Sequence, residues 1–139
     1  MYKSKLGLVL IIGLIFICTC SEEIGVKTKI IGKWEMIKVK ELSEDVTESH
    51  NPDKDRWIRF LADKNIEEGG LFESGRNNVK ENSGKWFYDR SENELYLDSD
   101  AGEEDDSYWS LTIEGNTMLW KGRKFEFNKR FEIEYERTD

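Results

Sequence analysis

Apolar and polar side chains alternate along most of the chain after residue 30, and this pattern limits the folds that the chain can adopt. In the segment 107–113, Trp109, Leu111 and Ile113 alternate with polar or tyrosine neighbours, and segment 131–137 repeats the pattern with glutamates. A period of two is typical of strands that bury one face. No segment after the first twenty residues sustains a helical period. We therefore predict an all-β fold.

The spacing of turn residues divides this part of the chain into strands. Eight strands are predicted, at residues 31–42, 55–62, 66–73, 79–89, 94–98, 107–113, 117–121 and 125–137. Short turns at 63–65, 90–93 and 114–116 alternate with longer polar connections at 43–54, 74–83, 99–106 and 122–130, counted with the polar residues that flank the strands. Alternate connections of an up-and-down antiparallel sheet lie at the same end. Eight such strands predict a small closed β-barrel, with tight turns at one end and long loops at the other.

The first twenty residues carry the features of an export signal. Lys3 and Lys5 precede an apolar run over residues 6–17, which is shorter than the about 20 apolar residues of a membrane-spanning helix. The run ends at Ile17, and Cys20 follows before a serine and two glutamates. This arrangement resembles the signal of bacterial lipoproteins, in which the cysteine is acylated and becomes the N-terminus. An ordinary secretory signal or an uncleaved anchor is the alternative.

The lipoprotein resemblance divides the chain into a signal peptide (1–19), a tether (20–30) and a barrel domain (31–139). It implies that acylated Cys20 anchors the protein in a bilayer of the bacterial cell envelope. Serine and glutamates after the cysteine resemble the signals for the outer membrane, and in some bacteria for its outer surface. The polar composition of the tether predicts little packing against the barrel.

Cysteine usage and charge exclude several functions. Both cysteines lie in the first twenty residues, so the folded domain has no disulfide, no cysteine-ligated zinc and no thiol nucleophile. Removal of the signal, which holds two lysines and no acid, lowers the formal net charge from −8 to −10. A polyanion binds nucleic acid poorly, and anionic membrane surfaces repel it. The lipid bilayer is therefore reached through the acyl chains, and no nucleic-acid partner is expected.

The tripeptide Gly-Lys-Trp occurs twice in the chain, and each copy opens an apolar stretch. In the first copy, Gly32 precedes Trp34 at the tight-turn end of the barrel, and Arg137 reaches the same end on the last strand. Arg137 is in phase with the apolar positions of that strand, so we expect its guanidinium to lie across the indole of Trp34 and close this end, which we call the floor. In the second copy, Gly84–Trp86, we expect a core tryptophan at a strand start.

These residues carry a resemblance to a known family. The chain resembles the short lipocalin-like domains of bacterial lipoproteins in three features. The first is a Gly-x-Trp at the first strand (32–34), and the second is an arginine near the end of the last strand, Arg137. The third is another Gly-x-Trp (84–86) that is followed by a Leu-x-Leu strand (95–97). The resemblance covers about residues 28–137. It implies a lipocalin-like barrel that binds a small apolar or amphipathic molecule.

Aromatic residues are the remaining candidates for a binding site. They are Trp57, Phe60, Trp86, Tyr88, Trp109, Trp120 and Phe127. Such side chains line a ligand cavity or fill a small barrel completely. A filled barrel corresponds to a second function, an envelope-tethered module that binds or inhibits another protein, whose identity the sequence leaves unknown.

Signals for catalysis, a metal or a cofactor are missing, and we expect none of the three. The one histidine, His50, lies in a predicted loop, so no Ser-His-Asp set is indicated. The acidic segment 98–107 has some spacing of calcium ligands. However, Glu103 stands where a calcium loop needs glycine, and Trp109 stands where it needs its closing glutamate, so a solvated loop is the better interpretation.

Overall fold

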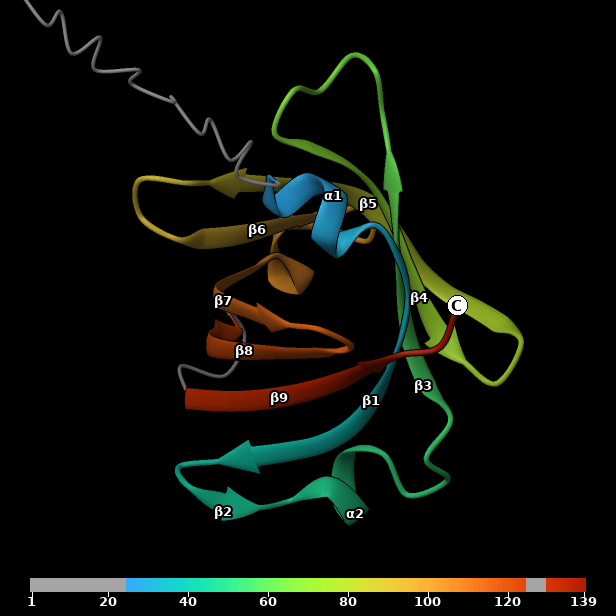
Figure 1. Ribbon diagram of the computed structural model, residues 1–139. Helices are drawn as coiled ribbons and strands as arrows, with labels where there is room; N and C mark the ends of the chain where they lie inside the picture. Colours follow the sequence, from blue (N-terminus) through green and yellow to red (C-terminus); the bar gives the residue numbers. More distant parts are fainter. Residues whose placement is uncertain (1–24, 125–129) are drawn as a thin grey trace, which may run out of the picture.

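The computed structural model describes residues 25–124 and 130–139, and the predicted all-β fold is confirmed. In these residues, eight antiparallel strands close into an up-and-down barrel, and one further short strand lies outside the ring (Figure 1). The strands are β1 (Gly32–Glu41), β2 (Glu44–Asp45), β3 (Arg56–Ala62), β4 (Gly69–Arg76), β5 (Val79–Asp89), β6 (Glu94–Ser99), β7 (Ser107–Glu114), β8 (Thr117–Lys124) and β9 (Arg130–Arg137). The helices are α1 (Val26–Ile30), α2 (Thr47–His50) and the 3-10 helix η1 (Glu103–Asp105). None of these described helices is long and apolar enough to span a bilayer.

The first strand closes the barrel because it pairs on both sides. β1 pairs with β3 only over Gly32–Glu35, whereas it pairs with β9 along most of its length. The β1–β9 register shifts between Met36 and Lys38, which marks a bulge. Farther along, β1 pairs with the short β2, and α2 follows. β1 and β3 therefore separate toward the end of the barrel where β1 finishes.

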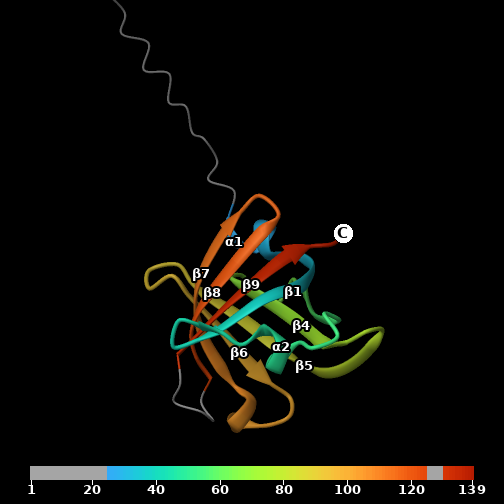
Figure 2. The same cartoon turned by 90° about the horizontal axis from the view of Figure 1, so that it is seen from below.

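The two ends of the barrel are built differently. The floor holds the start of β1, the turn 115–116 and the end of β9. The opposite end, which we call the mouth, holds the segment 42–55 and the loop 100–106. Figure 2 shows α1, the β7–β8 turn and the C-terminus at one end, and the loop with η1 at the other.

The prediction of strictly alternating short and long connections is wrong at two places. The β3–β4 loop at the floor is longer than predicted and covers residues 63–68, whereas β4 and β5 are joined at the mouth by the two residues 77–78. The glycines of segment 69–76 caused both errors, because they have no side chain and leave gaps in the alternation. A positive φ of 52° at Asn77 matches a tight hairpin turn. The direction of each strand is unaffected.

The helix α1 packs against the floor, which the sequence analysis did not predict. Ile30 is fully buried, and Val26, four residues earlier and on the same side of the helix, packs against the same core. The prediction that the tether packs little is therefore wrong for residues 26–30. A helix this short shows no repeat of its apolar spacing, so its packing face was not visible in the pattern.

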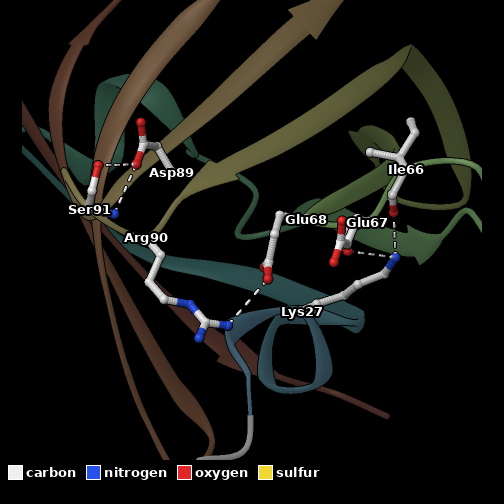
Figure 3. Close-up of polar contacts among 7 residues, drawn as sticks. All are labelled: Lys27, Ile66, Glu67, Glu68, Asp89, Arg90 and Ser91. Atoms are coloured by element: carbon white, nitrogen blue, oxygen red, sulfur yellow. Dashed lines mark hydrogen bonds and ion pairs between the residues drawn. The ribbon is translucent and has the colours of Figure 1, made fainter.

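Polar contacts also hold α1 in place (Figure 3). The ammonium of Lys27 donates to the backbone carbonyls of Asp63, Ile66 and Glu67 at 3.3, 2.6 and 3.2 Å. These three carbonyls belong to the β3–β4 loop, so Lys27 joins the loop to the helix. These contacts hold α1 and the β3–β4 loop together at the floor.

Candidate functional site

The floor is closed by the contact expected between Trp34 and Arg137. Trp34 is fully buried, and its Nε1 donates to the carbonyl of Ile30 at 2.8 Å. The Cζ atom of Arg137 lies 4.2 Å from the centroid of the Trp34 ring. The same guanidinium donates to the carbonyls of Ile31, at 2.6 Å, and of Lys29. The arginine thus ties α1 and β1 to the last strand.

Gly32 is required beside this contact. Its φ of +128° is one that residues with a Cβ rarely adopt, and a Cβ built there would meet Nη1 of Arg137 at 2.6 Å. The first Gly-Lys-Trp unit is therefore explained by its place at the floor. Its glycine leaves room for the guanidinium of Arg137, and its tryptophan supplies the ring on which the guanidinium packs.

Large side chains fill the half of the barrel next to the floor. Phe60 and Trp86 are fully buried and pack edge to face with centroids 5.7 Å apart. The indole Nε1 of Trp86 donates to the carbonyl of Leu61 at 3.1 Å. Tyr88 is also buried, and its hydroxyl donates to Oδ1 of Asn93 at 2.8 Å in a turn at the floor. Of the predicted aromatic candidates, these three lie in the core and do not border the cavity described next.

A cavity of about 400 Å³ occupies the half of the barrel next to the mouth, and it is partly open. Small-molecule sites typically have volumes of about 300–1,000 Å³. Its apolar lining includes Val39, Ile58, Phe72, Leu97 and Ile133. The barrel interior is therefore filled in one half and hollow in the other.

Three aromatic rings, packed at a tilt to one another, form one wall of the cavity. Trp109 and Trp120 lie 5.3 Å apart between ring centroids, and Trp120 and Tyr135 lie 4.7 Å apart. All three border the cavity. Trp109 and Trp120 were among the predicted candidates, whereas Tyr135 was predicted only as an inward residue of the last strand. The wall presents ring faces and edges to a ligand, which suits a flat or chain-like apolar body.

The cavity also contains buried donors without acceptors. The Nε1 of Trp109 donates to Oγ of Ser107 at 2.8 Å, but the Nε1 of Trp120 and the Nε of Arg56 are buried without a hydrogen-bond partner in the described chain. Such unpaired groups are rare, because leaving a buried donor unsatisfied costs about 1–3 kcal/mol. Burial raises the pKa of the Tyr135 hydroxyl, and the positive charge of Arg56 offsets this effect in part.

Arg56 was missed by the sequence analysis, although a signal was present. In the sequence RWIRF, Arg56 is in phase with Ile58 and Phe60, whose side chains are buried in the barrel. A charged residue in phase with buried apolar neighbours indicates an inward charge. Its backbone is held by Asn51, a buried residue whose Oδ1 accepts from the backbone N–H of Arg56 at 3.1 Å.

Trp57 is buried and borders the cavity, as predicted for a lining or core residue, although it is out of phase with Ile58 and Phe60 on β3. Lys33 Nζ and Arg59 Cζ lie 5.3 and 5.9 Å from the centroid of its ring. Side chains three positions apart on a strand point to opposite faces, so Trp57 and Phe60 could not both face inward. Phe127, the last predicted candidate, lies outside the described residues.

Charged side chains surround the mouth. His50 packs edge to face on Phe131 with centroids 5.6 Å apart, and its Nε2 lies 4.0 Å from Oε2 of Glu41. Arg76 donates to Glu81 at 2.9 Å. The sequence also places a run of basic residues near this end, namely Lys121, Arg123, Lys124, Lys129 and Arg130, of which Lys129 lies outside the described residues.

The acidic segment 98–107 forms internal hydrogen bonds. Asp106 is buried, and its Oδ1 accepts from the backbone N–H of Ser99 at 2.8 Å. Its Oδ2 accepts from the hydroxyl of Tyr96 at 3.0 Å; burial and then this bond raise the pKa of Tyr96 to about 12. Within the described residues, no group of three His, Cys, Asp or Glu side chains is arranged to hold a metal ion.

Neither comparison with known proteins identifies a relative. No model of a known protein family matches the chain, and no curated protein matches it.

Proposed function

We propose that the protein is a lipocalin-like binding protein that holds a small apolar or amphipathic molecule inside its barrel. The observation that carries this proposal is the cavity of about 400 Å³ above a filled and closed floor. A partly open cavity with an aromatic wall and several polar groups beside apolar ones matches the general character of small-molecule sites. The resemblance of the two Gly-Lys-Trp units to lipocalin-like lipoproteins supports the same function.

A fluorescent apolar probe tests the proposal. We expect N-phenyl-1-naphthylamine, which brightens in apolar surroundings, to bind saturably at one site with a dissociation constant on the order of micromolar. Ser74 faces the cavity opposite Ile58 and Asn82. Ser74→Phe should fill part of the cavity and weaken binding by about tenfold or more, because overpacked interiors do not expand freely.

The control places the same change on the outside of the barrel. Ser110 is exposed on β7, so Ser110→Phe should leave the affinity for the probe within about twofold of the wild type. Binding that is absent, or that is unaffected by Ser74→Phe, would overturn the cavity as the binding site. Native mass spectrometry of protein from its own host would then reveal the mass of any natural ligand.

The alternative function, an envelope-tethered module that binds another protein, is supported by a different surface. Phe87, Tyr96 and Tyr108 form a stacked row across the outside of β5, β6 and β7, with centroid distances of 6.1 and 4.5 Å. Phe87 and Tyr108 are 37% and 38% exposed. Exposed aromatic rows of this kind are common in protein interfaces. Capture of a protein partner together with an empty cavity would favour this alternative.

We also propose that Cys20 is acylated and holds the protein to a bilayer of the bacterial envelope, at the outer membrane. Helix α1 is packed on the floor, so about six residues separate the acylated cysteine from the fold, and they span at most roughly 20 Å. The floor would consequently stay near the bilayer, and the mouth would face the aqueous phase.

Substitution of the cysteine tests the anchor. Cys20→Ala removes the residue that accepts the acyl chains on which stable anchoring depends. The variant should therefore leave the membrane fraction or remain unprocessed. The matched variant Cys18→Ala should remain membrane-bound after a high-salt wash. If Cys20→Ala loses its signal peptide and still fractionates with membranes after a high-salt wash, the lipoprotein proposal fails.

A further inference from the structure

One positive charge, that of Arg56, borders the cavity, whose lining combines apolar residues with polar ones such as Ser74 and Asn82. Arg56 is the first residue of β3 and is in phase with Ile58 and Phe60. The pairing of β1 with β3 ends at Glu35↔Trp57, so Arg56 lies one residue beyond the last pair, on the side of the mouth. Arg56 therefore lies where β1 and β3 separate and the interior opens. The guanidinium borders the cavity, and its Nε is buried without a hydrogen-bond partner in the described chain.

A second unpaired donor borders the same space. Trp120 is 2% exposed, and its Nε1 has no hydrogen-bond partner among the described residues. Its ring lies 4.7 Å from that of Tyr135, whose hydroxyl is close enough to Arg56 to sense its charge. The side chains of Arg56, Trp120 and Tyr135 thus bring N–H and O–H donors to the border of one cavity.

The carboxylates around the cavity leave Arg56 without a partner of its own. Glu81 borders the cavity, but it is paired with Arg76 at 2.9 Å. Asp105, the other bordering acid, also has an interaction partner. No hydrogen bond or ion pair joins Arg56 to an acid within residues 25–124 and 130–139. Arg56 is only partly exposed, and holding a partly buried cation without an anion is unfavourable, so a ligand that supplies the anion would be stabilised there.

We propose that the cavity selects amphipathic anions, that is, small molecules with an apolar body and one carboxylate or comparable oxyanion group. The guanidinium of Arg56 pairs with the oxyanion, the indole N–H of Trp120 donates a second hydrogen bond, and the wall of Trp109, Trp120 and Tyr135 holds the apolar body. A guanidinium matches a carboxylate in geometry and offers charge-assisted hydrogen bonds. This inference rests on the proposed function, because it assigns the ligand class of the same cavity.

A matched pair of probes separates the two proposals. The probe 8-anilinonaphthalene-1-sulfonate has the ring system of N-phenyl-1-naphthylamine with one added sulfonate. At 0.15 M salt, which screens the net negative charge of the surface, we expect the anionic probe to bind the wild type at least about tenfold more tightly than the neutral probe. Dodecanoate should displace the anionic probe at lower concentration than dodecanol does.

Arg56→Met keeps a side chain of similar length and removes the charge. It should weaken binding of the anionic probe by about 10- to 100-fold and change binding of the neutral probe by about twofold or less. Arg59→Met makes the same charge change on the outward face of the same strand and should alter neither affinity. Trp120→Phe should weaken the binding of the anionic probe a few-fold more than the binding of the neutral probe, because the substitution removes one hydrogen-bond donor and keeps an aromatic ring. Near-ultraviolet circular dichroism verifies that each variant is folded.

The outcomes distinguish the two proposals. If neither probe binds, the cavity is not a binding site, and the proposed function fails together with this inference. If the neutral probe binds and the anionic probe binds no more tightly, the proposed function stands and the selection of anions is overturned. If Arg56→Met weakens both probes equally, Arg56 shapes the cavity without pairing to the ligand, and the inference is overturned as well.

Discussion

Trp34→Ala is expected to lower the free energy of unfolding by about 3–5 kcal/mol, the range typical of large-to-small changes of buried aromatic residues. Trp34 is fully buried at the floor, and its indole N–H is bonded to the carbonyl of Ile30. The substitution removes the ring, leaves a cavity and frees the guanidinium of Arg137, so its effect is expected to be among the largest of any single change. Urea unfolding followed by circular dichroism measures it.

The contact with Arg137 makes the two losses non-additive. Arg137→Ala should lower the free energy of unfolding by less than Trp34→Ala does. The loss in the double variant should be smaller than the sum of the two single losses by about 0.5–2 kcal/mol, because the cation–π contact can be lost only once. A cycle of Trp34→Ala with Arg59→Ala is the control, since Arg59 contacts Trp57 instead. If the losses for Trp34→Ala and Arg137→Ala are additive, the cation–π contact does not stabilise the floor.

The floor and the barrel were predictable because the sequence repeats its signal many times. Each strand alternates over several residues, and hairpin turns separate the strands, so one ambiguous position does not change the topology. The pairing of Trp34 with Arg137 then followed from strand direction and phase alone. Phase also predicted which residues of β9 point inward, Tyr135 among them.

The parts that were missed depend on single residues or on tertiary contacts. The helix α1 has only one turn, and its position depends on the docking of Lys27 to the carbonyls of the loop 63–68. β4 holds glycines at 69, 70 and 75, and these hide the alternation. The hollow half of the barrel could not be predicted, because a list of aromatic residues does not show which of them meet across the interior.

Gly84, in the second Gly-Lys-Trp unit, lies where neighbouring strands approach too closely for a side chain. It faces Phe72 on β4 and Ser99 on β6. A Cβ built at Gly84 would lie 2.0 Å from the carbonyl oxygen of Asp98 and 2.8 Å from Cε1 of Phe72. The Phe72 ring covers the glycine and is itself buried, an arrangement by which an aromatic residue on the next strand compensates for the missing side chain. The two units therefore need glycine for different reasons, backbone conformation at Gly32 and close approach at Gly84.

Gly84→Ala is accordingly expected to cost about 3 kcal/mol or more, at or above the upper end of the usual range for overpacked sites. The nearest clashing atom belongs to the backbone of β6, so relief requires the β5–β6 pair to shift, and a change of rotamer is not enough. Gly115→Ala is the matched control, because a Cβ there meets nothing within 4 Å and only its φ of +58° opposes the change; its cost should be about 1–2 kcal/mol. Chemical denaturation of both variants gives the comparison. A loss at Gly84 no larger than that at Gly115 would mean that β5 and β6 can separate at little cost, and the close packing of the strands around Phe72 would then not explain the second glycine.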